Sequence, residues 1–153
     1  MLGTGLALAP VGSYLAVMGH FAWAPVLLGF TVLTWVAGFD IIYALQDEEF
    51  DKSKQLYSVP VMLGKSGALR LSKIVHAVTA ILLLTTVWQI HETLGGTVNW
   101  IIWVGTTVFL SMLVYQHTLV KPNDLTKVNL AFFTTNGIAS LVFGTLAIID
   151  LMF

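Results

Sequence analysis

Long stretches without a charged residue are the feature that most constrains this chain. Residues 1–19 and 21–39 contain no Asp, Glu, Lys or Arg, and a helix needs about 20 apolar residues to cross the hydrocarbon core of a bilayer. Hydrophobic residues make up 57% of the chain and charged residues only 10%, whereas soluble domains are roughly 25% charged. The surplus of apolar surface therefore predicts a protein that lies in the lipid bilayer.

The apolar runs predict an all-α fold, a bundle of five transmembrane helices in a single membrane domain. The predicted spans are residues 2–18, 22–45, 69–90, 98–117 and 128–150. Residues 48–66 are more polar and contain Pro60 and Gly64, which interrupt regular structure. We expect this segment to be a short amphipathic piece and a loop that together cap the cytoplasmic side.

The basic residues predict the orientation in the membrane. All seven Lys and Arg residues lie between the second and third predicted spans, at the start of the third, or between the fourth and fifth, which places them on one side of an alternating topology. Cytoplasmic connectors carry an excess of Lys and Arg. The chain is therefore predicted to be a multi-pass protein of the inner (cytoplasmic) cell membrane, with these connectors facing the cytoplasm.

Charge and cysteine content exclude other classes of function. The net charge is -1 and no basic patch is available to neutralise phosphates, so we expect no nucleic acid partner. The absence of cysteine excludes disulfides, iron–sulfur clusters and thiolate chemistry.

A row of carboxylates stands where the second span ends. On one continuous helix Asp40, Tyr43, Asp47 and Asp51 would form a single stripe, because they occur at i, i+3, i+7 and i+11. Asp47 and Asp51 repel each other unless a cation lies between them. Magnesium is typically held by one or two carboxylates together with substrate phosphates. Asp47 and Asp51 are therefore the candidate ligands of a Mg²⁺ ion.

The pattern Asp-x-x-Tyr-Ala-x-Gln-Asp-x-x-x-Asp over residues 40–51 resembles the second aspartate-rich motif of the UbiA superfamily of intramembrane aromatic prenyltransferases. Residues 56–64 and 116–137 are similar to later segments of its 4-hydroxybenzoate polyprenyltransferase-like branch. The resemblance covers essentially the whole chain and implies the C-terminal part of a nine-helix fold. The first aspartate-rich motif of the family, of the Asn-Asp-x-x-Asp-x-x-x-Asp kind, does not occur in this sequence. We therefore expect N-terminal helices carrying that motif to be missing partners, and this chain alone to be inactive.

The resemblance implies an enzyme of quinone biosynthesis. It would use Mg²⁺ to transfer a polyprenyl group from polyprenyl diphosphate to an aromatic acceptor, either 4-hydroxybenzoate or a menaquinone-pathway precursor. The polyprenyl tail would lie among apolar helices open to lipid. The implied catalytic residues are Asp40, Tyr43, Asp47 and Asp51, and the implied substrate-binding residues are Gln46, Lys52, Lys54 and His117.

Alternatives stay open for several of these residues. Lys52 and Lys54 are also explained as ordinary flanking lysines on the cytoplasmic side, and His117 as a boundary residue bonded to backbone or headgroups. Glu48 and Glu49 lie off the stripe and are interpreted as the solvated end of the helix.

Other polar residues have structural interpretations. The four histidines do not form a ligand set, and His76 is expected towards the far side of the membrane from the carboxylates. Asn129 and Asn136 are expected to make hydrogen bonds between helices.

Two other functions are compatible with the sequence. A non-enzymatic channel or carrier with an acidic vestibule would conduct cations and would not need prenyl diphosphate. An inactive truncated homologue would only pack against other subunits. An in-frame upstream extension carrying the first aspartate-rich motif would favour the enzyme.

Overall fold

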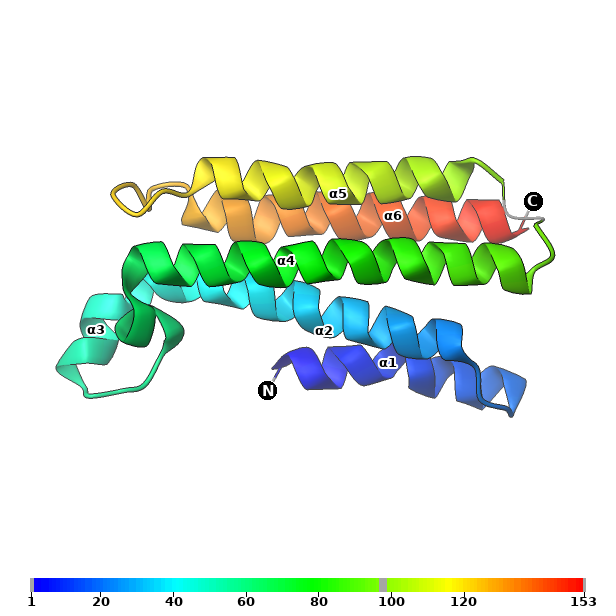
Figure 1. The fold of residues 1–153 in the computed structure, drawn as a ribbon, viewed down its shortest axis with the longest axis horizontal. Helices are drawn as coiled ribbons and strands as arrows, with labels where there is room; N and C mark the ends of the chain where they lie inside the picture. Colours follow the sequence, from blue (N-terminus) through cyan, green and yellow to red (C-terminus); the bar gives the residue numbers. More distant parts are fainter. Residues whose placement is uncertain (1, 97–98, 153) are drawn as a thin grey trace.

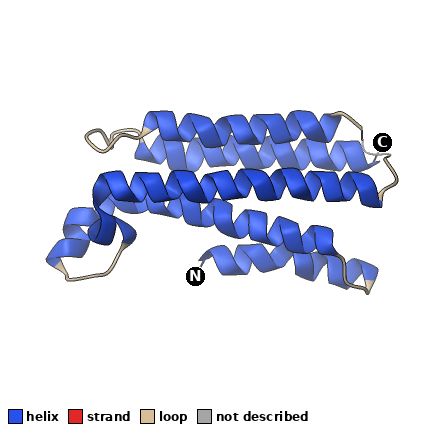
Figure 2. Cartoon of the chain, in the orientation of Figure 1, coloured by secondary structure: helices blue, strands red, loops and turns tan. Residues whose placement is uncertain are grey.

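The computed structural model describes residues 2–96 and 99–152, which form helices and connecting loops without a β-strand (Figures 1 and 2). The five long helices are α1 (Leu2–Met18), α2 (Trp23–Tyr43), α4 (Val59–Thr93), α5 (Ile101–Leu119) and α6 (Thr135–Met152). They lie side by side in an elongated bundle. The all-α helical bundle predicted from the apolar runs is confirmed.

Among the residues that the structure describes, four helical stretches are long and apolar enough to cross a membrane. They are Trp23–Ser53, Val59–Thr93, Ile101–Leu119 and Leu130–Met152. The first helix is apolar and 17 residues long, which is at the lower limit of about 17 residues for a span. Large apolar side chains cover the outside of the bundle, since Phe30, Ile81 and Leu141 are 53%, 65% and 72% exposed. This surface requires lipid rather than water, so the chain is a membrane protein.

Two buried clusters hold the helices together. At the end of α2, Ile42 and Leu45 pack with Ala68 of α4 and with Val128 and Ala131 near the start of the last helix. A second cluster, built around Leu83, Val87, Ile102, Phe109 and Ala139, joins α4, α5 and α6. The first cluster fixes the end of α2 in place and therefore positions the carboxylates.

The α-helical part of α2 stops before the carboxylate row is complete. Residues Ala44–Asp47 form a 3₁₀ turn (η1), and Glu48–Ser53 form the short helix α3. A 3₁₀ helix turns about 120° per residue and an α-helix about 100°, so four residues rotate everything beyond them by about 80°. The predicted single stripe through Asp40, Tyr43, Asp47 and Asp51 is therefore wrong. No Pro or Gly occurs in residues 39–51 to signal the change.

The helix α4 begins earlier than the third predicted span, at Val59, and bends at Gly64. Gly64 has φ 67° and ψ 167°, a conformation that glycine adopts at no steric cost. Residues 48–66 thus consist of α3, a short loop and the first turns of α4. Arg70 and Lys73 lie on α4, beyond this bend.

One end of the bundle carries all the basic residues. The segment from α3 to the bend in α4 and the loop between α5 and α6 both lie at the left end in Figure 1. Lys52, Lys54, Lys121 and Lys127 belong to these parts of the chain, and Lys65, Arg70 and Lys73 follow the bend on α4. The connection between α1 and α2 and the end of α4 lie at the opposite end. That the basic end faces the cytoplasm stays a prediction.

Candidate functional site

The last turns of α2 carry a row of aromatic rings. Trp35, Phe39 and Tyr43 are spaced four residues apart and therefore share one side of the helix. Phe132, in the π-helical turn η2 (Leu130–Thr134), has its ring centre 5.2 Å from that of Phe39 and 4.4 Å from that of Tyr43. Phe133 approaches Tyr43 edge-on at 6.3 Å. We call these five residues the aromatic wall.

An apolar cavity of about 770 Å³ lies against the aromatic wall, between α1, α2 and α6. Trp35, Phe39, Phe132 and Phe133 all line it. Its volume is within the range of about 300–1,000 Å³ that is usual for small-molecule sites. The cavity can therefore hold an apolar ligand group next to the carboxyl-bearing end of α2.

The three aspartates at this end form the acidic row, defined as Asp40, Asp47 and Asp51. Asp40 and Asp47 are exposed and Asp51 is half-buried. Within residues 2–96 and 99–152, none of their carboxylates makes a hydrogen bond or an ion pair. Carboxylates at the end of a membrane span are costly unless solvated or paired. The acidic row is thus free to bind a cation or a cationic group from outside the chain.

The donor set of the acidic row suits magnesium bound together with a phosphate ligand. The described residues contain no group of three or more His, Cys, Asp or Glu side chains that could hold a metal ion by themselves. Magnesium needs fewer protein ligands than that, because it keeps several waters and is commonly bound by one or two carboxylates plus substrate phosphates. Asp47 and Asp51 supply hard oxygen donors of this kind.

Two hydrogen bonds within the described residues join α2 and the 3₁₀ turn after it to the last helical stretch. Gln46 donates from Nε2 to Oδ1 of Asn129 over 3.4 Å, and Trp35 donates from Nε1 to Oδ1 of Asn136 over 3.2 Å. Both contacts connect elements that are far apart in the sequence. The interhelical hydrogen bonds expected of Asn129 and Asn136 are confirmed.

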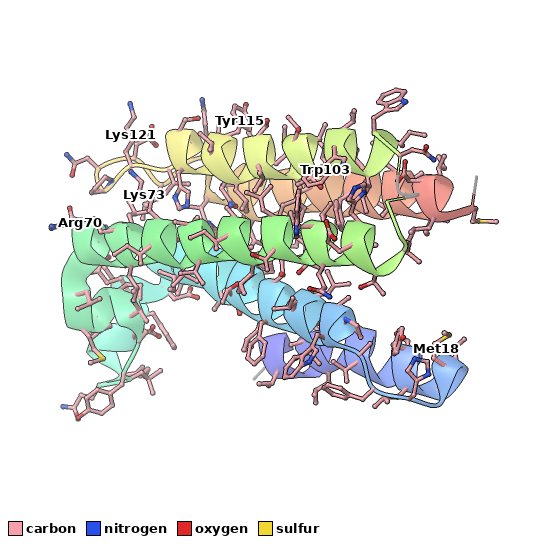
Figure 3. The ribbon with its side chains drawn as sticks, turned by 45° about the vertical axis from the view of Figure 1, so that its right-hand side comes forward. Met18, Arg70, Lys73, Trp103, Tyr115 and Lys121 are labelled. Atoms are coloured by element: carbon pink, nitrogen blue, oxygen red, sulfur yellow. The ribbon has the colours of Figure 1, made fainter. Side chains whose placement is uncertain are left out.

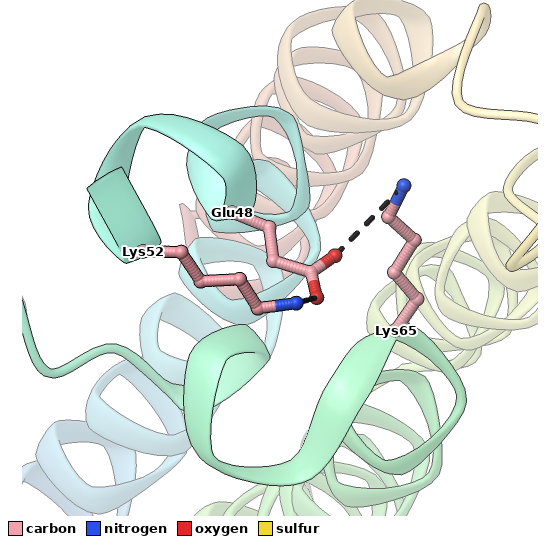
Figure 4. Close-up of polar contacts among 3 residues, drawn as sticks. All are labelled: Glu48, Lys52 and Lys65. Carbon is pink, nitrogen blue, oxygen red and sulfur yellow. Dashed lines mark hydrogen bonds and ion pairs between the residues drawn. The ribbon is translucent and has the colours of Figure 1, made fainter.

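Glu48 is the centre of an ion-paired group that we call the Glu48 cluster (Figure 4). Its side chain is 7% exposed, and Lys52 lies 2.6 Å and Lys65 3.8 Å from its carboxylate oxygens. The interpretation of Glu48 as part of a solvated helix end is therefore wrong, whereas Glu49 is exposed. Lys52 is held by Glu48, and Lys54 is exposed without an ion pair in the part of the chain that the structure describes.

His76 lies beside His117, so its expected place on the far side is wrong. His76 Nδ1 is 2.9 Å from His117 Nε2 and 3.2 Å from the Gln116 amide nitrogen, and its Nε2 is 3.2 Å from the Trp35 carbonyl oxygen. These distances fit a His76 that donates from Nε2 to Trp35 and accepts at Nδ1. Gly38 makes room for the ring, because a Cβ built there would overlap it.

The structure does not bring His117 together with the acidic row. His117 lines the hollows between α4 and α5, whereas the cavity beside the aromatic wall is lined by α1, α2 and the last helix. Contact between His117 and an aromatic acceptor in that cavity has no support in this geometry.

Together these features define a class of protein. It is a helical membrane bundle in which α2 lines an apolar cavity with aromatic rings and leads, at its end, to three carboxylates that have no partner among the described residues. The model of the UbiA prenyltransferase family matches residues 1–138, so the chain belongs to that family. This confirms the resemblance at the level of the superfamily and gives a prenyltransferase-type function. Neither a curated protein nor a solved structure matched the chain.

Several site residues were not found from the sequence. The spacing of Trp35, Phe39 and Tyr43 was an available signal for part of the aromatic wall. The contacts of Phe132 with this row and of His76 with His117 join residues more than 40 positions apart. No local pattern in a single sequence indicates such pairs.

Proposed function

We propose that this protein takes part in the transfer of a polyprenyl group from polyprenyl diphosphate to an aromatic acceptor, 4-hydroxybenzoate or a menaquinone-pathway precursor, in quinone biosynthesis. One observation carries the proposal. The acidic row has no partners within the described chain, and it lies at the end of the helix whose aromatic wall lines the apolar cavity. Membership of the family supports prenyl diphosphate and an acceptor as substrates in a membrane.

In this proposal the diphosphate binds at the acidic row. Asp47 and Asp51 would hold Mg²⁺, which, when bound, neutralises the charge of the departing diphosphate. Asp40, in the last turn of α2, supplies a third carboxylate at this end of the bundle. The Tyr43 hydroxyl and the second proton of the Gln46 amide are available to bond a phosphate oxygen or to orient an aspartate.

The two lysines contribute differently. Lys52 is occupied by Glu48 at 2.6 Å, so its contribution to diphosphate binding would require breaking that ion pair. Lys54 makes no ion pair in residues 2–96 and 99–152. Of the two lysines, Lys54 is therefore the better candidate for a direct contact with the diphosphate.

The aromatic wall would act on the prenyl group. When the allylic carbon–oxygen bond breaks, its electron pair leaves with the diphosphate and positive charge stays on the prenyl carbon. The faces of aromatic rings attract cations, and the apolar cavity excludes water that would otherwise capture the cation. The electron-rich ring of the acceptor then forms the new carbon–carbon bond and loses a proton.

The sequence contains one of the family's two aspartate-rich motifs, so we do not expect product from this chain alone. The primary test is therefore binding of the polyprenyl diphosphate donor. The purified 153-residue chain in nanodiscs should bind a radiolabelled polyprenyl diphosphate more tightly with Mg²⁺ than with EDTA. The same preparation with a panel of phenolic acids should yield no prenylated product. Donor binding that is indifferent to Mg²⁺ would contradict the proposed role of the acidic row, and product formation would contradict the need for a second motif.

The orientation can be tested separately. By the excess of basic residues at the acidic end, we propose that the acidic row faces the cytoplasm of a cell membrane. A cysteine introduced at Lys54 should react with an impermeant thiol reagent only after the cytoplasmic side is opened. Labelling from the outside of intact cells would show that the acidic row faces away from the cytoplasm.

A further inference from the structure

A basic pocket lies between the start of α4 and the end of α5, away from the aromatic wall. Its volume is about 580 Å³, and its charged lining residues are Arg70, Lys73 and Lys121. Figure 3 shows these three residues at the same end of the bundle. No acidic side chain lines the pocket.

The three basic side chains of this pocket make no ion pair within the described chain. Arg70 makes only a long hydrogen bond, 3.5 Å from Nε to the Ser66 carbonyl oxygen, and neither Lys73 nor Lys121 has an ion pair there. Asp124 is bridged to Lys121 through the backbone. Its carboxylate accepts bonds from Thr126 at 3.1 and 2.6 Å, which hold the pKa of Asp124 below its ordinary value.

An apolar groove continues from the pocket along the bundle. The groove has a volume of about 460 Å³ and is lined by Ala77 and Ala80 of α4 and by Leu110, Leu113 and Val114 of α5. Lys73, His117 and Thr118 line both the pocket and the groove, so the two hollows adjoin each other. The small side chains on α4 leave the space that the groove occupies.

The dimensions match one leaflet of a bilayer. Arg70, Lys73, Ala77 and Ala80 share one face of α4, because they are spaced three, four and three residues apart. The ten residues from Arg70 to Ala80 rise about 15 Å. This is half of a hydrocarbon core that is about 30 Å thick.

We propose that the pocket and the groove together bind one anionic phospholipid. The lipid phosphate contacts Arg70, Lys73 and Lys121, and one acyl chain occupies the groove between α4 and α5. Basic pockets between transmembrane helices bind anionic headgroups by charge, and here an apolar channel of leaflet length adjoins the charges. The site offers no carboxylate to hold a metal ion, which distinguishes it from the acidic row and disfavours a magnesium-bound diphosphate.

Native mass spectrometry of the detergent-purified chain tests this site. Titration with phosphatidylglycerol should give at least fivefold more one-lipid adduct than phosphatidylcholine with the same acyl chains. Lys73→Gln and Lys121→Gln should each reduce that preference by half or more. Lys127→Gln, which removes one charge at the same end but outside the pocket, should leave it unchanged. A preference that is absent in the wild type, or is reduced equally by Lys127→Gln, would overturn the proposal.

A separate variant tests whether the acyl chain occupies the groove between α4 and α5. Ala80→Leu should fill the groove and lower the phosphatidylglycerol adduct at least twofold, with an unchanged melting temperature and elution volume as the check on folding. If the melting temperature falls, the same comparison is made with Ala77→Leu. An adduct that both variants leave intact would overturn the assignment of the groove.

Competing ligands distinguish the source of the phosphate. Inorganic phosphate at millimolar concentration should not displace the lipid, because it lacks the acyl chain. Displacement by inorganic phosphate would mark a site for free anions, and displacement by farnesyl diphosphate at lower concentration than phosphatidylglycerol would mark a second donor site. Either result would overturn the lipid assignment.

Discussion

The acidic row and the Glu48 cluster are adjacent in the sequence and have opposite environments. Asp47 is exposed without a partner in the described chain, whereas the next residue, Glu48, is buried against two lysines. The 3₁₀ turn explains the difference. Ile42, Leu45 and Glu48 are three residues apart, they are 0%, 1% and 5% exposed, and three residues per turn brings such positions to one side. The local helix type therefore determines that Glu48 forms buried ion pairs, whereas Asp47 stays exposed and accessible to a ligand.

The largest effect should follow from removing a carboxylate of the acidic row. Asp47→Asn and Asp51→Asn should each weaken Mg²⁺-dependent binding of polyprenyl diphosphate about 100-fold, because loss of groups around a metal costs 10–100-fold even for residues that do not touch it. Neither variant loses an internal contact, so the melting temperature should not change. Equilibrium binding in nanodiscs, with Glu49→Gln as the matched control, measures the effect. An equal loss in Glu49→Gln would show a general charge effect instead.

The next effect concerns the His76 ring, whose nitrogens make hydrogen bonds inside the bundle. Gly38→Ala should destabilise the protein by about 1–3 kcal/mol, because the added methyl overlaps the His76 ring in a packed core. Gly144→Ala is the control, since a Cβ at Gly144 has no neighbour within 4 Å. Unfolding in mixed micelles measures the difference. Equal stability of the two variants would mean that the ring of His76 moves aside without cost.

Breaking the Glu48 cluster should have a smaller effect. Glu48→Gln should lower the free energy of unfolding by about 1–2 kcal/mol. This value lies between those for exposed and for buried ion pairs, because Glu48 is buried but the Lys52 side chain is 54% exposed. Glu49→Gln should change it by less than about 0.5 kcal/mol. Mg²⁺-dependent donor binding should survive in both. Loss of donor binding in Glu48→Gln with unchanged stability would place Glu48 with the acidic row.

The sequence predicted those parts of the fold that depend on apolar length and local pattern. The helical bundle follows from runs such as residues 21–39, and the family follows from residues 40–51, which the family model supports. The interruption at Gly64 was predicted from the glycine itself, whereas the 3₁₀ turn at Ala44–Asp47 was not, because tertiary packing selects between helix types that differ little in energy. The basic pocket was not predicted, because it joins Arg70 and Lys73 of α4 with Lys121, which lies far away in the sequence.

The smallest predicted effect concerns the hydrogen bond between Gln46 and Asn129. It distinguishes a structural role of Gln46 from a role in binding the diphosphate. The contact of Gln46 with Asn129 is 3.4 Å long and exposed, and hydrogen bonds between transmembrane helices average about 0.6 kcal/mol in double-mutant cycles. A cycle of Gln46→Ala and Asn129→Ala should therefore give a coupling in the free energy of unfolding of about 0.6 kcal/mol or less. If the second amide proton of Gln46 binds the diphosphate, Gln46→Ala weakens donor binding while Asn129→Ala leaves it nearly unchanged. Equal losses of donor binding in the two variants would mean that Gln46 only holds the end of α2 against η2.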